Sequence, residues 1–274
     1  MPDIFQYLFF RNALIGIAII SIASAIIGTY IVTRRLVAIS GGVTHACFGG
    51  LGLGYFLGIN PIFSAGVFAI AASLAVERMS SKGHVREDSA IAVVWALGMA
   101  IGILFVFLTP GYVPELNSFL FGNVLTISTS DLTAFGIYTA VLIAFFAIFY
   151  RSILVCAFDR DFASVINLPV RFITYSMTVL VAICIVLTIR LVGIMLLMSM
   201  LSLPQMIAEL YCRRFLPIMI LSAGISLTAC IGGLFIATVI DVPCSALIVL
   251  IMASLYCILR ILRPLIHRHK QPLP

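Results

Sequence analysis

The chain has 274 residues, of which 63% are hydrophobic and only 9% are charged. Together with a mean hydropathy of +1.23, this composition excludes a soluble domain with a polar surface and indicates a protein that crosses a membrane several times. The net charge of +6 does not indicate nucleic-acid binding, because the basic residues lie between the apolar runs, where they orient a membrane protein.

Several apolar runs are long enough to cross a bilayer, which takes about 20 helical residues. They are 12–33, 36–58, 61–80, 89–108, 131–150, 172–189, 191–208, 216–239 and 243–262. The first is too long for the apolar core of a secretory signal, so we interpret it as a span. Only Arg190 interrupts 172–208, which leaves eight or ten spans as alternatives to nine. We therefore expect an all-α polytopic membrane protein with a single transmembrane domain over residues 1–274.

The basic residues also predict the orientation of the spans. If the basic tail after residue 259 is cytoplasmic, alternation of nine spans places every lysine and arginine inside except Arg11 and Arg190. This distribution follows the positive-inside rule. The N-terminus is then expected outside, and the inner segments are 34–35, 77–88, 151–171 and 213–214.

The run 36–58 carries small residues at a strict four-residue step. Residues at this spacing form one stripe along a helix, and small ones let a neighbouring helix approach closely. This run is therefore expected to be a helix buried among others, with the stripe as its packing surface. The stripe consists of Gly42, Ala46, Gly50, Gly54 and Gly58.

The same run holds His45, ten residues after Arg35. If the arginine marks an interface, the histidine lies about 15 Å deep, near the middle of the bilayer. A neutral imidazole there can be a ligand of a transition metal, with partners from other helices. The alternative is a histidine that holds helices together by a hydrogen bond, and the residue by itself favours this second interpretation.

Segment 109–130 contains no basic residue, and its central SFLFG is apolar enough to re-enter the membrane without crossing it. Irregular backbone at that depth must be covered by protein or line a cavity, so we expect an outer vestibule. Glu115, Asp131 and Asp241 would surround it and attract cations. Carboxylates that merely cap helices are an equally good interpretation of each one.

Segment 151–171 is expected to contain a short interfacial helix on the inner side. Asp159 can cap its start, and Asn167 suits a left-handed exit. Its apolar positions share one face. Such a helix can dock into a soluble partner or rest on the lipid surface, and the pattern favours neither. The apolar positions are Phe162, Val165 and Ile166.

The sequence offers no recognisable catalytic chemistry. Its two lysines, Lys82 and Lys270, do not end a G-x-x-x-x-G-K-[ST] loop, and neither H-E-x-x-H nor G-x-S-x-G occurs. Met195 and Met198 are interpreted as packing residues rather than soft metal ligands. We therefore expect a protein that is not an enzyme and takes its energy from elsewhere.

Six segments in order resemble the permease subunit of ATP-binding-cassette importers for zinc, manganese and iron. The resemblance covers nearly the whole chain, and the order of the segments is more specific than any one of them. The segments are LVAISGGVTHACFGGLGLGYFLG, REDSAIAVVWALGMAIGILF, VPELNSFLFGNVL, FDRDFASVINLPV, LVGIMLLMSMLSLPQMIAEL and IDVPCSALIVL.

The resemblance implies a type II importer-like fold in a bacterial cytoplasmic membrane. It also implies a homodimer, driven by two cytoplasmic ATPase subunits that bind ATP and supplied by an extracytoplasmic metal-binding protein. A divalent metal ion would be the cargo, with no resident cofactor. His45 matches the family's histidine in the metal pathway. The segment that resembles the coupling helix, which sits in a cleft of the ATPase, has Asp159, Phe162, Ala163 and Leu168 at the matching positions.

The chain departs from the family pattern at Gly41. Many relatives carry an aspartate there, four residues before the histidine and on the same helix face. Its loss puts the identity of the metal in doubt. An ion-coupled secondary transporter is the alternative function, because broken spans and a midplane histidine fit it as well. Against it, the spans lack a chain of carboxylates for a proton relay.

Overall fold

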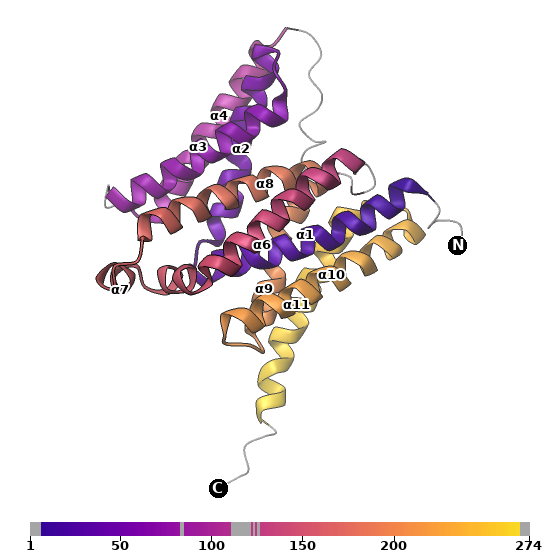
Figure 1. The fold of residues 1–274 in the computed structure, drawn as a ribbon. Coiled ribbons are helices and arrows are strands. Elements are labelled where there is room, and N and C mark those ends of the chain that lie inside the picture. The colour runs from indigo at the N-terminus through magenta and orange to yellow at the C-terminus, as the bar shows by residue number, and fades with distance from the viewer. Residues whose placement is uncertain (1–6, 83–84, 111–121, 123, 125–126, 269–274) are drawn as a thin grey trace.

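The computed structural model of the chain describes residues 7–82, 85–110, 122, 124 and 127–268. Every regular element in these ranges is a helix (Figure 1). The helices, labelled as in Figure 1, are α1 (Leu8–Thr33), α2 (Val37–Leu57), α3 (Pro61–Lys82), α4 (Glu87–Leu108), α6 (Thr129–Phe158), α7 (Arg160–Val165), α8 (Val170–Met200), α9 (Leu203–Glu209), α10 (Phe215–Ile240) and α11 (Cys244–Arg268).

Eight helices of the described part are long and apolar enough to cross a membrane, judged by length and composition. One of them covers 40 residues from Val170 to Glu209, about twice the length of a span. Its backbone leaves the helical conformation at Gly193, with φ 81° and ψ 171°. The predicted runs 172–189 and 191–208 both lie in this stretch. The interruption therefore falls at Gly193, three residues after the predicted one at Arg190, because glycine lacks a Cβ and adopts a positive φ readily.

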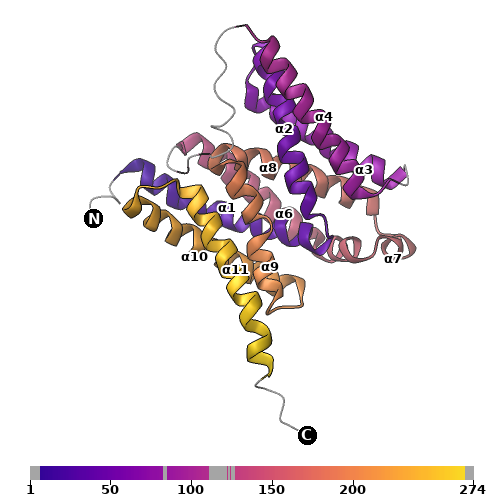
Figure 2. The ribbon, with the colours of Figure 1, turned by 180° about the vertical axis from the view of Figure 1, so that it is seen from behind.

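The long helices form two groups with α8 between them. Helices α2, α3 and α4 pack together, and both views show them as a separate unit (Figures 1 and 2). Helices α1, α6, α10 and α11 form the second group, in which α1 packs against both α6 and α10. Helix α8 contacts α2 and α3 on one side and α1, α6 and α11 on the other. In the orientation predicted from the charges, the α7 side is the inner end of the molecule and the Gly193 side is the outer end.

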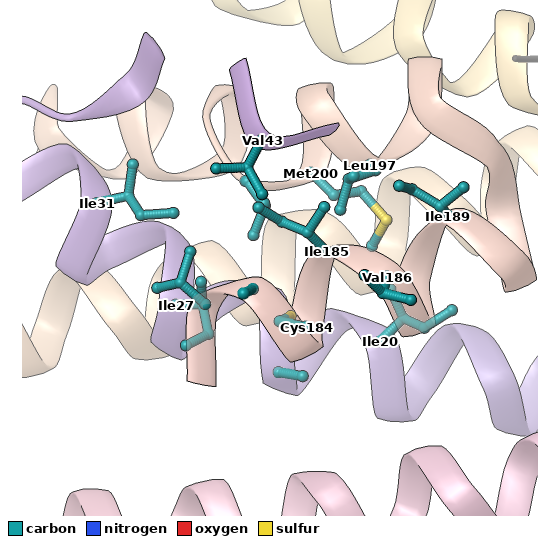
Figure 3. Packing of buried hydrophobic residues seen from close by; sticks show 14 of the residues in the cluster. Ile20, Ile27, Ile31, Val43, Cys184, Ile185, Val186, Ile189, Leu197 and Met200 are labelled. Atoms are coloured by element: carbon teal, nitrogen blue, oxygen red, sulfur yellow. The ribbon is translucent and has the colours of Figure 1, made fainter. Parts of the chain in front are cut away.

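The centre of the protein lies where α1, α2 and α8 meet (Figure 3). Ile27 of α1, Val43 of α2 and Ile185 of α8 are each at most 1% exposed. Leu197 and Met200, which follow the break in α8, are buried in the same cluster. Both halves of α8 thus contribute to one apolar core, which holds the two groups of helices together.

Four of the five predicted stripe residues lie at close contacts of α2. A Cβ on Gly50 would come within 2.6 Å of the backbone of Ala65, and one on Gly54 within 2.7 Å of the backbone of Pro61, both in α3. Gly42 faces Ile91 of α4, and the backbone of Gly98, also in α4, lies against Ala46. The stripe therefore contacts two helices rather than one.

The prediction is wrong at Gly58. A Cβ there would have no atom within 4 Å, so this residue is not a packing contact. Its φ of 67° is left-handed, and its N–H donates to the Tyr55 carbonyl at 3.2 Å, while the next N–H, of Ile59, donates to the Gly54 carbonyl at 3.0 Å. Gly58 ends the helix, a position for which glycine is favoured because it lacks a Cβ.

The closest approach of α2 to α4 involves glycines outside the stripe. Gly52 lies against the backbone of Gly102, and Gly102 lies against the backbone of Phe48. Backbone atoms cannot move aside as the end of a flexible side chain can. This contact therefore requires glycine on both helices.

We predict that Gly52→Ala destabilises the protein, because its methyl group would overlap the backbone of Gly102. Overpacking of this kind costs about 1–3 kcal/mol or more. The melting temperature in detergent should fall. In the control, Gly136→Ala in α6, the new methyl meets no atom within 4 Å and should leave the melting temperature unchanged or slightly raised. Equal melting temperatures for both variants would contradict the tight α2–α4 contact.

Candidate functional site

His45 lies in the middle of α2, half-buried against α4. Its ring stacks on Trp95, with the ring centroids 4.8 Å apart and the planes 5° from parallel. Its Nδ1 atom is buried and has no hydrogen-bond partner among the described residues. The sequence also allowed a histidine that joins helices by a hydrogen bond. The described residues form no such bond at Nδ1. Imidazole binds metals through a lone pair that lies in the plane of the ring. Trp95 stacks on the face of the ring and therefore does not block this lone pair.

A cavity of ≈550 Å³ lies one helical turn from His45 toward the inner end, between α2, α4 and the second half of α8. Gly41, Trp95 and the methionines Met195 and Met198 are among its lining residues. The Met198 methyl lies 2.9 Å from where a Cβ on Gly41 would be. The flexible thioether side chain of Met198 thus partly fills the space that a larger side chain at position 41 would occupy.

The donors near His45 are soft or neutral rather than anionic. The cavity presents the two methionine sulfurs and the hydroxyls of Ser40, Ser199 and Ser202, with Asp88 at its inner end. No group of three His, Cys, Asp or Glu side chains with metal-binding geometry occurs in the described part of the chain. Within the described residues of one copy, His45 is therefore the principal nitrogen donor of the candidate pathway.

The outer carboxylates are not all available to attract cations. Asp131 forms an ion pair with Arg190 of α8 at 2.9 Å and a reciprocal capping box with Ser128 at the start of α6. Its charge is largely compensated, which favours the capping interpretation. Asp241 ends α10 with a left-handed φ of 59°, is exposed and lines a separate cavity of ≈440 Å³. Glu115 and the SFLF part of the predicted re-entrant segment lie outside the described residues.

The described residues of segment 109–130 reach into the protein. Val124 is 1% exposed, and the carbonyl of Ile127 accepts a hydrogen bond from the buried Asn12 side chain at 3.1 Å. Gly122, with a φ of 56°, lies against the backbone of Gly193 where α8 is broken. Gly122 and Gly193, where the backbone is irregular, therefore pack against each other.

Helix α7 occupies the segment predicted to dock a partner. The Asp159 carboxylate accepts a hydrogen bond from the Phe162 N–H at 2.9 Å and caps the helix, as the sequence predicts. Asn167 has the predicted left-handed conformation, with φ 58°. Phe162 and Val165 are 54% and 77% exposed, so an apolar face points away from the rest of the chain.

The four positions taken from the resemblance separate into two kinds. Ala163 is fully buried, and Leu168 packs against the core. The N–H of Leu168 also donates to the carbonyl of Ala163 at 3.1 Å. These two residues hold α7 onto the protein, whereas the Phe162 side chain is exposed.

The residue-by-residue reading of the sequence missed two features. Trp95 was not assigned a role, although its run contains the G-x-x-x-G pair Gly98 and Gly102, which signals close packing of α4 on a neighbour. A partly buried cluster of two arginines and two glutamates at the inner end was also missed. Its members come from four separate segments, so no spacing along the sequence reveals it. They are Arg34, Glu77, Glu87 and Arg160.

Comparison with known proteins gives matches along nearly the whole chain. The sequence model of the ABC 3 transport family matches residues 6–263. A probable metal transport system membrane protein of Chlamydia pneumoniae is 36% identical over 242 residues, which are 86% of this chain and 83% of the relative. The manganese transport system membrane protein MntC of Listeria innocua is 30% identical over 264 residues, 96% of this chain and 94% of the relative.

A solved structure is similar at the level of the fold as well. PsaBC from Streptococcus pneumoniae, in complex with Fab, contains a chain that matches with a TM-score of 0.81 and 27% identity. The match covers 94% of this chain and 92% of that chain. The helices and their arrangement are therefore those of a PsaC-type permease.

We predict that Gly41→Asp increases the affinity of the purified protein for Mn²⁺, because a carboxylate would then share a helix face with His45 and suits this ion. Only the flexible end of Met198 has to move. The gain should be at least roughly tenfold, since even residues that only hydrogen-bond to a metal ligand change metal affinity by that much.

Isothermal titration with MnCl₂ measures the change. Gly41→Asn, of equal size but neutral, is the control and should gain little. The gain should disappear when His45→Ala is added. An equal gain without His45 would contradict a site at this point of α2.

Proposed function

The chain belongs to the ABC 3 transport family, and we propose that it is the membrane permease of an ATP-driven importer that brings a divalent transition-metal ion into the cytoplasm. Manganese is the first candidate for the cargo, before zinc and iron. The observation that carries the proposal is the match along 96% of this chain to a protein named as the manganese transport system membrane protein.

The candidate metal pathway supports a transport role. The Nδ1 atom of His45 is buried within a span without a hydrogen-bond partner among the described residues, and a cavity lies one turn inward. A few weak donors in series suit conduction, because an ion that is bound too tightly is not released. In this proposal the ion passes His45 and leaves through the cavity between α2, α4 and α8.

The energy would come from a separate ATPase, since the sequence has no P-loop of its own. Helix α7 supports this part of the proposal. It is capped, fixed by Ala163 and Leu168, and exposes Phe162 at the inner end. An exposed aromatic anchor on a short helix fits a hydrophobic cleft of a partner.

We further propose that the permease acts as a homodimer. A metal-binding protein would deliver the ion at the outer end, near the exposed Asp241. Both assignments rest on the resemblance to the importer family.

Elemental analysis of cells tests the function. Manganese, zinc and iron should be measured with the complete system, with the ATPase gene deleted and with His45→Ala. One metal should rise only with the complete system, and both changes should remove the rise. Accumulation that survives loss of the ATPase but stops with a protonophore would contradict the importer and support the ion-coupled carrier.

We predict that Phe162→Glu uncouples ATP hydrolysis from metal uptake without preventing insertion, because it removes the apolar anchor from an exposed position. Loss of one buried anchor at a protein interface costs about 2 kcal/mol or more, which is roughly thirtyfold in binding. Co-purification of the ATPase and uptake in cells measure the effect. Phe162→Leu, which keeps an apolar side chain, is the control. Normal coupling in Phe162→Glu would show that α7 is not the docking helix.

A further inference from the structure

The inner end contains a charged cluster that connects four segments. It is composed of Arg34 between α1 and α2, Glu77 of α3, Glu87 at the start of α4 and Arg160 at the start of α7. Glu77 lies at its centre: Arg160 is 3.0 Å from one carboxylate oxygen and Arg34 is 3.9 Å from the other. Arg34 also donates to Glu87 at 3.2 Å and to the Tyr30 hydroxyl at 3.1 Å.

The central pair of this cluster is removed from water. The side chains of Arg34 and Glu77 are only 7% and 9% exposed. Burial lowers the pKa of Arg34, but its contacts with Tyr30, Glu77 and Glu87 outweigh this and raise the pKa above its ordinary value. The guanidinium therefore stays charged. Removing Glu77 would leave Arg160 without an ion-pair partner among the described residues, whereas removing Arg160 leaves Glu77 paired with Arg34.

The cluster connects α7 to a group of helices that it otherwise hardly touches. Helix α7 packs mainly on its chain neighbours α6 and α8. The Arg160–Glu77 ion pair is the one described ion pair that joins α7 to α3. Through Arg34 and Glu87, the same carboxylate is connected to the start of α2 and to α4.

Helices α2, α3 and α4 are suited to move as one body. Their glycines place backbone against backbone, and such contacts do not deform gradually. His45 is part of this body, on α2. A force applied at Glu77 would therefore reach His45 without a flexible connection between them.

We propose that Glu77 is a positioning residue that transmits the movement of α7 to the α2–α3–α4 unit, with Arg160 as the input and Arg34 as the connection to α2. The inference rests on the proposed ATP-driven import. Arg160 and Glu77 would not touch the metal. Their role is to make the position of His45 depend on the position of α7.

The test uses the complete complex of permease, ATPase and metal-binding protein reconstituted in lipid vesicles, with ⁵⁴Mn²⁺ uptake and ATP hydrolysis measured on the same sample. Arg160→Gln is the main variant, because Arg160 is 31% exposed on its side chain and Glu77 keeps Arg34 as a partner. Arg160→Lys keeps the charge. Arg171→Gln is the matched control, since Arg171 is an exposed arginine that lines one pocket together with Arg160 and Glu77 but has no ion pair among the described residues.

The expected result is a fall in metal imported per ATP hydrolysed in Arg160→Gln by at least about fivefold, the lower end of typical coupling between sites. The ratio should recover in Arg160→Lys and stay at the wild-type value in Arg171→Gln. A residue with only a structural role would reduce the amount of complex and leave this ratio unchanged.

Three results would overturn the inference. They are an unchanged ratio in Arg160→Gln, an equal fall in Arg171→Gln, and loss of the ATPase from the Arg160→Gln complex, which would make Arg160 a docking residue. Absence of ATP-dependent uptake in the wild-type complex would instead refute the proposed function. The two failures are therefore distinguishable.

Discussion

The direct contact between the backbones of α2, α3 and α4 is the constraint on which the rest of the structure depends. Gly50 of α2 packs against the backbone of α3, and Gly52 of α2 packs against Gly102 of α4. Both contacts are too close to leave room for a side chain. Within a membrane, where apolar side chains gain little by leaving lipid, such close packing is a main source of helix association. It fixes His45 relative to two neighbouring helices and makes the three helices one unit.

The second half of α8 borders the cavity that lies one helical turn from His45. The backbone leaves the helical conformation at Gly193, and Gly122 packs against the irregular peptide there. Met195 and Met198 are thereby placed beside Gly41. The candidate pathway thus depends on Gly193, which interrupts α8, and on Gly41, which leaves space for the Met198 side chain.

Sequence patterns predict the apolar spans, the α2 stripe and the cap of α7 because these features depend on local spacing. Asp159 and Asn167 behave as their residue types require. Gly58 shows the limit of such reasoning: its spacing matches the stripe, but the helix ends there. The Arg190–Asp131 pair and the cluster around Glu77 join segments far apart in the sequence, so they follow from the arrangement of the helices. The stacking of Trp95 on His45 likewise needs the α2–α4 contact.

The most direct test of the proposed function is the direction and energy source of transport in vesicles that contain the purified complex. With α7 facing outward, ATP added outside should drive ⁵⁴Mn²⁺ from the interior to the outside, toward the side on which α7 lies. Vesicles in which α7 faces the interior should accumulate the ion when ATP is enclosed in that interior. Transport that ignores ATP on the α7 side but follows an imposed proton gradient would contradict the importer.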